Sequence, residues 1–218
     1  MKLFDQHTHN AKTIPGAGVV NLPMGVLSEP ESFHPTAGQL YSAGIFPLYE
    51  GDWDRALENL KKLIQHPQLV ALGECGLDKR SNVPFLKQEN FFEAQVILAD
   101  QMKKHLIIHC VRAWRELFVI NRLHPTEQRR IVHGFRGKPE LACQLIETGF
   151  YLSFGPLFNA DSLRLCAPER RLIETDDSNL TLMQVNTLQH VRQNISIPLF
   201  LLFIISYICN QTMAMVNQ

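Results

Sequence analysis

The stretch Leu3-Phe-Asp-Gln-His7-Thr-His9, close to the N-terminus, is the segment from which the fold of this chain can be inferred. Successive side chains of an extended strand point to opposite faces, so His7 and His9 share one face and lie about 7 Å apart. Two imidazoles at that separation can converge on one metal ion. A lone His-x-His pair arises easily by chance, so its meaning depends on whether the pattern recurs.

The same arrangement, a short apolar run that leads into a metal-capable side chain, recurs four times along the chain. The four segments are Leu69-Val-Ala-Leu-Gly-Glu74, Leu106-Ile-Ile-His109, Arg130-Ile-Val-His133 and Arg171-Leu-Ile-Glu-Thr-Asp176. Each is short enough for a strand, and helix-period sequence separates most of them, which indicates a parallel sheet. Polar side chains at the C-terminal ends of such strands are typical of barrel enzymes. The sequence therefore predicts an α/β fold, a compact TIM-type (β/α) barrel, as a single domain over residues 1–218.

Three further segments complete a predicted set of eight strands, at residues 18–22, 39–46 and 149–155. Between the second and third strands, segment 30–38 shows little helical periodicity. The second crossover helix of a regular barrel is therefore expected to be missing or replaced by a loop. The predicted barrel has an irregular N-terminal quarter.

Helices are predicted between the later strands from apolar residues at i, i+3 and i+4 spacing. The first has Asp52 as its N-cap and ends before Pro67, and the others cover 87–104, 113–123, 139–148 and the neighbourhood of Leu163. Segment 195–209 is strongly apolar, but Pro198 interrupts it and it is shorter than the roughly 18 residues of a membrane span. We expect a buried closing helix there, and no membrane insertion.

The charge balance of the chain counts against a broad nucleic-acid-binding surface. Lys plus Arg and Asp plus Glu are both 21, which gives a formal net charge of zero. No long basic run marks an electrostatic footprint for nucleic acid. Any recognition of a polyanion must therefore depend on cations placed locally.

The cysteines and the N-terminus indicate a cytoplasmic protein. The five cysteines are widely spaced and form no Cys-x-x-Cys pair, which suits reduced thiols. Cys75 and Cys110 each follow a candidate ligand, so on strands they should point away from it and pack against the helices. A charge follows the first few residues, so no secretory signal is expected. The sequence leaves the oligomeric state open, with a monomer slightly favoured.

The candidate ligands at the predicted strand ends supply four imidazoles and two carboxylates. They are His7, His9, Glu74, His109, His133 and Asp176. A satisfied core residue is the commoner explanation for any one of these histidines. Six such residues at matching strand ends instead favour a site for two divalent ions, with a carboxylate able to bridge them.

Six segments, in their order along the chain, resemble the TatD family of metal-dependent hydrolases. They are Phe4-Asp-Gln-His-Thr-His9, Leu72-Gly-Glu-Cys-Gly-Leu-Asp78, Ile107-Ile-His-Cys-Val-Arg112, Val132-His-Gly-Phe-Arg-Gly137, Gly149-Phe-Tyr-Leu-Ser-Phe-Gly155 and Glu174-Thr-Asp176. The second and the last are the most specific. The resemblance implies a TIM-type barrel, two divalent metal ions and hydrolysis of phosphodiesters, typically as a magnesium-dependent deoxyribonuclease, with DNA or another phosphodiester as substrate. The mixed His and carboxylate ligands themselves accept Mg, Mn or Zn.

Carried over by position, the resemblance also implies how the ligands divide. His7, His9 and Asp176 would hold one ion, His109 and His133 the other, and Glu74 would lie between them.

The chain departs from the family in three places. It has Gly44-Ile-Phe46-Pro47 where the family commonly has Gly-Ile-His-Pro, so Phe46 replaces a histidine that is expected to face the substrate. The N-terminal quarter is shorter than usual. Residues 193–218 carry no charged side chain, where the family tends to end in a charged amphipathic segment.

The expected chemistry is attack by a metal-bound hydroxide, because water bound to a divalent ion loses a proton far more readily than bulk water. Asp176 is the candidate base, and Glu74 is the second catalytic carboxylate. Arg112 and Arg136 each follow a candidate ligand by three residues and would bind phosphate oxygens, although surface ion pairs explain them equally well. Glu174 shares a face with Asp176 and is expected to orient a ligand.

Three functions fit these residues. The first is a metal-dependent nuclease or related phosphodiesterase, and the second is a small-molecule amidohydrolase or esterase on the same two-metal scaffold. Cations at the mouth of the site separate the two, and Arg112, Arg136 and Lys138 supply them. The third, a non-catalytic protein stabilised by metal, is favoured by the departures at Phe46 and the C-terminus but disfavoured by the six ligands.

Overall fold

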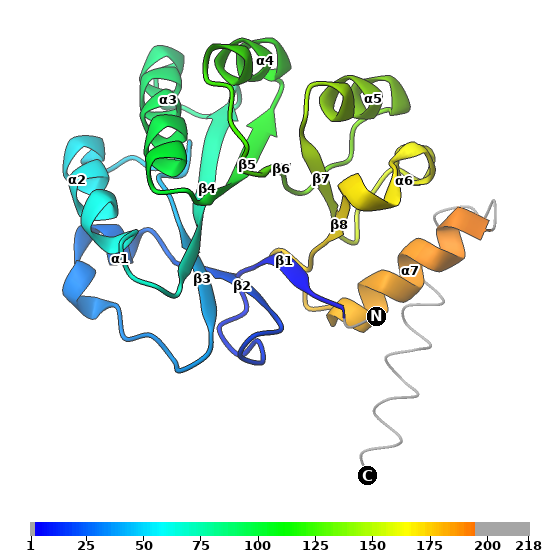
Figure 1. Ribbon diagram of the computed structural model, residues 1–218, viewed down its shortest axis with the longest axis horizontal. Helices are drawn as coiled ribbons and strands as arrows, with labels where there is room; N and C mark the ends of the chain where they lie inside the picture. Colours follow the sequence, from blue (N-terminus) through cyan, green and yellow to red (C-terminus); the bar gives the residue numbers. More distant parts are fainter. Residues whose placement is uncertain (1–2, 195–218) are drawn as a thin grey trace.

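The eight predicted strands form one sheet in the computed structural model, which describes residues 3–194 (Figure 1). The strands are β1 (Asp5–Thr8), β2 (Gly18–Asn21), β3 (Leu40–Ala43), β4 (Leu69–Asp78), β5 (His105–Val111), β6 (Arg130–Val132), β7 (Tyr151–Phe154) and β8 (Arg171–Ile173). Each strand pairs in parallel with the next one along the chain. This order confirms the prediction of a TIM-type barrel.

The barrel closes between β1 and the residues that follow β8. The backbone N–H of His9 donates to the carbonyl oxygen of Asp176 at 3.0 Å, and the N–H of Asp176 donates to that of His7 at 3.0 Å. The buried Asp5 carboxylate accepts hydrogen bonds from the N–H of Thr175 at 3.0 Å and from its hydroxyl at 2.6 Å. Closure therefore places Asp176 directly beside the N-terminal histidines.

The helices lie outside the sheet; all but the last lie on connections between successive strands, and the last follows β8 (Figure 1). They are α2 (Trp53–Leu63), α3 (Phe85–Gln101), α4 (Trp114–Leu123), α5 (Pro139–Glu147), α6 (Ala160–Leu165) and α7 (Leu182–Asn194), with a 3-10 turn, η2 (Pro168–Arg170), before β8. Asp52 caps α2 as predicted, because its carboxylate accepts the N–H of Arg55 at 3.0 Å. Helix α3 ends earlier than predicted, since Lys103 adopts a left-handed φ of 52°.

The sequence pattern did not predict helix α7. Its first turn is set by Thr181, whose N–H donates to the side-chain oxygen of Gln184 at 2.8 Å while its hydroxyl accepts the N–H of Gln184 at 3.3 Å, a capping box. The buried Gln189 holds α7 to the sheet by donating to the carbonyl oxygen of Phe154 at 2.7 Å. A helix held partly by polar contacts carries little apolar periodicity, which explains why it was missed.

The N-terminal quarter is irregular, as predicted. The connection from β2 to β3 holds only a single helical turn, α1 (Gly25–Ser28), and a 3-10 turn, η1 (Pro30–Ser32). No helix follows β1 before β2 begins. The predicted closing helix at 195–209 lies outside the described residues, and within 3–194 no helix is both long and apolar enough to cross a membrane.

Strand β4 is irregular at Glu74. The strand continues four residues beyond Glu74, so the prediction that it ends there is wrong. Leu72 pairs with Leu106 and Cys75 pairs with Ile108, so β4 has one residue more than β5 over this interval. Such a β-bulge redirects a side chain without ending the strand. Glu74 therefore reaches the site from within β4.

Two glycines allow β4 and β5 to approach each other around the bulge. Gly73 and Gly76 have φ values of 142° and 145°, where residues with a side chain are strained. A Cβ atom on Gly76 would lie 1.9 Å from the carbonyl oxygen of His109. No rotation of a side chain relieves that clash, because it involves backbone.

The cysteines next to the candidate ligands pack as predicted. Cys75 and Cys110 are buried in the main hydrophobic cluster between the sheet and the helices. Burial raises the pKa of the Cys75 thiol well above its usual value and that of Cys110 to about 12. Both residues therefore serve as apolar packing groups.

Replacing Gly76 by Ala is expected to destabilise the barrel by about 3 kcal/mol or more, because the added methyl group forces β4 and β5 apart and requires a strained φ. The matched control is Gly25→Ala, where an added Cβ meets nothing within 4 Å, and the expected change is below about 0.5 kcal/mol. Urea unfolding of the two variants measures the difference. Equal stabilities would contradict a close approach at Gly76.

Candidate metal centre

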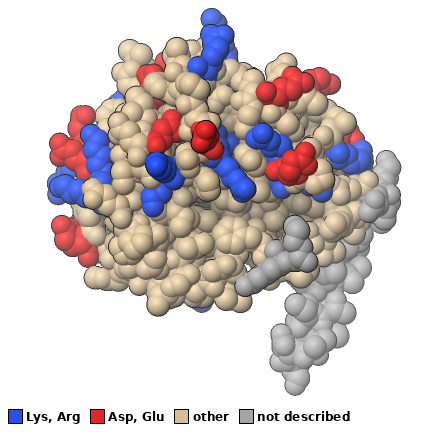
Figure 2. Space-filling model, in the orientation of Figure 1, with Lys and Arg blue, Asp and Glu red and all other residues tan. Residues whose placement is uncertain are grey.

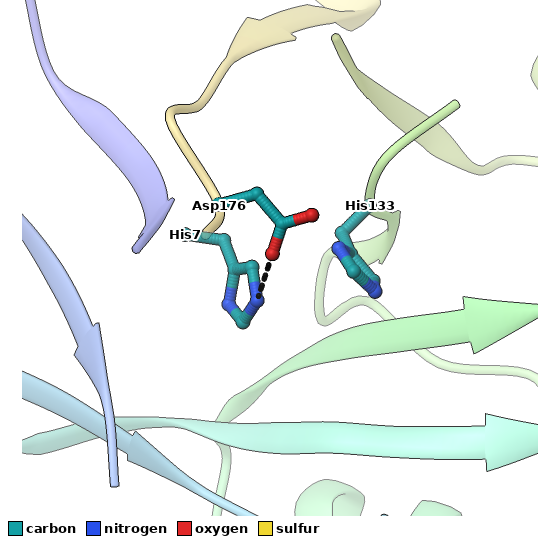
Figure 3. A group of neighbouring side chains, drawn as sticks. All are labelled: His7, His133 and Asp176. Carbon is teal, nitrogen blue, oxygen red and sulfur yellow. Dashed lines mark ion pairs between the residues drawn. The ribbon is translucent and has the colours of Figure 1, made fainter. Parts of the chain in front are cut away.

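The structure brings all six candidate ligands together at the C-terminal ends of the strands. His7 and His109 lie in β1 and β5, whereas His9, His133 and Asp176 follow β1, β6 and β8. The ring centroids are 5.0 Å apart for His7 and His9, 4.6 Å for His7 and His133, and 5.6 Å for His109 and His133. Figure 3 shows three of these side chains, from different elements, turned toward one region.

The Glu74 carboxylate lies between two pairs of histidines. Its Oε2 atom is 3.6 Å from the Nε2 atoms of both His7 and His9. Its Oε1 atom is 2.9 Å from Nδ1 of His109 and 2.8 Å from Nε2 of His133. One carboxylate oxygen therefore faces each pair, which is the geometry that a bridging ligand requires.

Asp176 completes the first group of donors. Its Oδ1 atom is 3.5 Å from Nε2 of His7, the contact drawn in Figure 3, and 3.7 Å from Nε2 of His9. The backbone of Asp176 has a φ of 55°, a left-handed conformation that is uncommon outside glycine. The two backbone hydrogen bonds that close the barrel hold it there.

The first group fits a divalent ion. The contacts among His7, His9, Asp176 and Oε2 of Glu74 are too long for good hydrogen bonds, and both ring nitrogens of the fully buried His7 lack a hydrogen-bond partner. Tetrahedral ligands about 2.1 Å from a metal ion lie roughly 3.4 Å from one another, close to the observed 3.5–3.7 Å. An ion bound by these donors would give Nε2 of His7, the ring nitrogen that faces Glu74, a partner.

The second group consists of Glu74, His109 and His133, whose ligand atoms all lie within 4.8 Å of one another. A carboxylate stands behind each of these two histidines. Nε2 of His109 is 3.1 Å from Oδ2 of Asp78, and Nδ1 of His133 is 3.6 Å from Oε1 of Glu174. The Asp78 contact is within hydrogen-bond distance, and a carboxylate in this position fixes the orientation of an imidazole that binds metal through its other nitrogen. The Glu174 contact is too long for a hydrogen bond, and its Oε1 atom instead accepts the N–H of Gly134 at 2.6 Å.

Sequence reasoning missed two polar residues that support the site. Asp78, with no exposed surface, accepts hydrogen bonds from Nε of Arg80 at 3.1 Å and from Nη2 at 2.9 Å while it contacts His109. Asn21 accepts the backbone N–H of Glu74 at 2.8 Å through Oδ1. The sequence alone could have identified Asp78 as a residue that faces the site, because it lies four residues after Glu74 and therefore on the same face of the strand.

The electrostatics keep the carboxylates ionised. Burial opposes the charge of Glu74, but the surrounding imidazoles outweigh it and hold the pKa of Glu74 well below its usual value. Burial likewise opposes the ionisation of Asp78, yet Arg80 and His109 lower its pKa to about 2. Burial and His133 disfavour a charged His7, but Asp176 and Glu74 raise its pKa to about 9. The imidazoles and Arg80 thus supply the positive charge that keeps these carboxylates ionised.

A cavity of about 670 Å³ opens over the cluster. Arg80, Arg112 and Arg136 line it together with five of the six candidate ligands, all except the fully buried His7. Arg112 and Arg136 are exposed, and within residues 3–194 neither guanidinium takes part in a hydrogen bond or an ion pair. Both remain available to a ligand in the cavity.

Phe46 also lines this cavity, at the position where the family resemblance leads us to expect a histidine. Its ring meets that of His109 edge to face, with centroids 5.0 Å apart. Its backbone N–H points to the sulfur of Met24 at 3.5 Å. Phe46 and Met24 thus give the cavity an apolar wall beside the second group of donors.

The sequence model described as "TatD related DNase" matches residues 32–197 of this chain, well over half of its length. The chain belongs to the TatD family. The match begins after His7 and His9, so the argument for these two residues comes from their geometry.

Curated relatives agree with the family assignment. The chain is 33% identical over 157 residues to an uncharacterized metal-dependent hydrolase of Buchnera aphidicola. The aligned region covers 65% of this chain and 60% of that protein. It is 32% identical over 146 residues to the 3'-5' ssDNA/RNA exonuclease TatD of Erwinia tasmaniensis, covering 62% and 56%. The chain therefore spans a little over half the length of the curated relatives that it matches.

Two solved structures share the fold of this TatD family member. The TatD homologue YJJV of Escherichia coli superposes with a TM-score of 0.66 at 18% identity, covering 90% of this chain and 99% of that one. A TatD family hydrolase of Entamoeba histolytica gives a TM-score of 0.64 at 15% identity, covering 90% and 93%. At these identities the likeness supports the barrel fold alone.

Replacing Glu74 by Gln is expected to lower the bound-metal content, because the substitution removes the charge that both donor groups share. We expect at least a tenfold loss of affinity for one ion, measured by calorimetry with Mn²⁺ or Zn²⁺ and by elemental analysis after dialysis. The matched control is Glu127→Gln, the same change at an exposed residue in the loop before β6. Undiminished metal content in Glu74→Gln would show that Glu74 bridges nothing.

Proposed function

We propose that this protein is a divalent-metal-dependent hydrolase that cleaves phosphodiester bonds in single-stranded nucleic acid. The observation that carries the proposal is the Glu74 carboxylate, divided between two pairs of histidines beneath a cavity with unpaired arginines. The name of the Erwinia relative, an ssDNA/RNA exonuclease, supports the same substrate class. We also propose two ions per chain, and a cytoplasmic location on the cysteine usage alone.

Each residue around the cavity has a defined task in this reaction. Divalent ions, when bound, stabilise charge on the phosphoryl oxygens and make a water molecule more acidic. Asp176, whose side chain is 19% exposed, reaches the cavity and accepts a proton from the attacking water. Arg112 and Arg136 donate hydrogen bonds to the non-bridging oxygens. Asp78 holds His109 in orientation, and the Glu174 carboxylate lies beside His133.

The cations favour a phosphodiester over the amide or carboxyl ester of the alternative amidohydrolase function. A carbonyl substrate develops one negative oxygen, whereas a phosphodiester already carries a charge that needs neutralisation. On the face drawn in Figure 2, Lys and Arg lie among Asp and Glu and form no continuous basic stripe. A phosphodiester in the cavity would therefore be recognised by the cations that line it, Arg112 and Arg136.

Asp176→Asn tests the proposed chemistry. The variant is expected to lose about 10²- to 10⁴-fold in kcat on a labelled single-stranded oligonucleotide, because the proton acceptor is lost. The control Asp54→Asn changes an exposed residue of α2 and should leave kcat unchanged. EDTA should abolish wild-type activity, and Mg²⁺, Mn²⁺ or Zn²⁺ should restore it. Activity that survives EDTA, or faster cleavage of an anilide than of both phosphodiesters, the oligonucleotide and bis(p-nitrophenyl) phosphate, would contradict the proposal.

Phe46→His tests whether the aromatic wall limits leaving-group protonation. Phenylalanine cannot donate a proton, so hydrolysis of DNA, which expels a poor alkoxide, should be slow compared with an activated aryl ester. The histidine variant is expected to narrow this gap by about tenfold or more, as measured by kcat on both substrates at saturating metal. Phe46→Leu, which stays apolar, is the control. Equal effects on both substrates would show that Phe46 only packs.

A further inference from the structure

A groove runs along the outer surface between α4 and α5, which are neighbouring helices in Figure 1. Helix α4 contributes Arg115, Phe118 and Arg122, and helix α5 contributes Leu141 and Gln144. None of the side chains that line the groove is an Asp or a Glu. The groove therefore combines cations, an aromatic ring and apolar surface.

The groove and the cavity over the candidate metal ligands share one residue of their walls. Trp114 lines both of them. It is the first residue of α4, three positions after the end of β5, and so lies at the rim of the barrel. A polymeric ligand with one end in the cavity can leave the cavity past Trp114 and continue along α4.

The cations in the groove are available. Arg115 and Arg122 are exposed, and no hydrogen bond or ion pair engages either guanidinium in the described part of the chain. They lie seven residues apart on one face of α4, which spaces them about 10 Å along the helix. The acidic residue of the first turn, Glu116, is instead paired with Lys79, its Oε1 atom 2.7 Å from Nζ.

We propose that the α4–α5 groove binds the part of a single-stranded nucleic acid that leads away from the scissile phosphodiester. Single-strand binding sites combine cations that follow the backbone with aromatic rings on which bases stack. Arg115 and Arg122 supply the former, and Trp114 and Phe118 the latter. A duplex keeps its bases stacked internally, so it cannot use the rings. The inference rests on the proposed function, and extends it from the reacting bond to the following nucleotides.

The double variant Arg115→Gln/Arg122→Gln tests the groove by binding alone. The probe is a fluorescein-labelled single-stranded oligonucleotide of about ten nucleotides, within the site sizes of single-strand binders, and anisotropy is measured in EDTA to prevent cleavage. We expect affinity about tenfold weaker, and a slope of log K against log salt that is shallower by about 1.4, because each phosphate contact contributes about 0.7. The matched control is Lys61→Gln/Lys62→Gln, at two exposed cations of α2.

Kinetics separate this inference from the proposed function. With metal present, the double variant should raise KM for the oligonucleotide about tenfold, yet leave hydrolysis of bis(p-nitrophenyl) phosphate unchanged, since that ester fills only the cavity. Phe118→Leu, which keeps an apolar side chain but removes the ring, should also raise KM for the oligonucleotide alone.

The two ideas fail in different ways. Wild-type affinity and salt slope in the double variant would overturn the groove, while oligonucleotide cleavage by the wild type would leave the proposed function standing. A wild type that cleaves neither substrate, yet shows the affinity difference, would overturn the proposed function and leave the groove as a nucleic-acid-binding surface.

Discussion

The position of the Glu74 carboxylate is the constraint on which the rest of the site depends. Both oxygens are engaged by imidazoles, one pair on each side, so a shift of the side chain would disturb both donor groups at once. The bulge in β4 aims Glu74 into the site, and Asn21 accepts the backbone N–H of Glu74 there. Gly76 then lets β5 approach closely enough for His109 to meet the same carboxylate. The bulge in β4 and the close approach at Gly76 are therefore what bring these side chains together.

The same arrangement places many charges where water is scarce. Four carboxylates, those of Glu74, Asp78, Glu174 and Asp176, surround the histidines, and three of the four are buried. Ionised groups in such surroundings are stable only when opposite charge lies close by. Within the chain, Arg80 supplies it for Asp78. The other carboxylates face His7 and His133, and they raise the pKa of His7 to about 9 and that of His133 well above its usual value. A divalent ion bound among these donors would supply positive charge in place of the protons on the imidazoles.

The sequence predicts features that repeat and misses features that occur once. Apolar runs leading into His109 and His133 share one pattern, and that pattern indicates both strand and site. Glu74 follows the same pattern, but β4 continues four residues beyond Glu74, just as β5 continues two residues beyond His109. The bulge at Glu74 leaves no periodic trace in so short a run. The contact that helps to close the barrel, from Asp5 to Thr175, joins residues 170 positions apart, and no local reading connects them. Helix α7 was not predicted because a polar residue, Gln189, anchors it to the sheet, so it lacks a clear apolar pattern.

A formal net charge of zero is compatible with a polyanionic substrate because position matters more than total charge. Exposed charges separated by more than about 10 Å are largely screened at physiological salt, so acidic residues on distant helices contribute little at the cavity. What a phosphate meets there is Arg112 and Arg136, both free of partners within residues 3–194. Arg80 differs from these two, because Asp78 already neutralises it and connects it to His109. Arg80 thus holds Asp78, and through it His109, while in the proposed function the two unpaired arginines attract the phosphate.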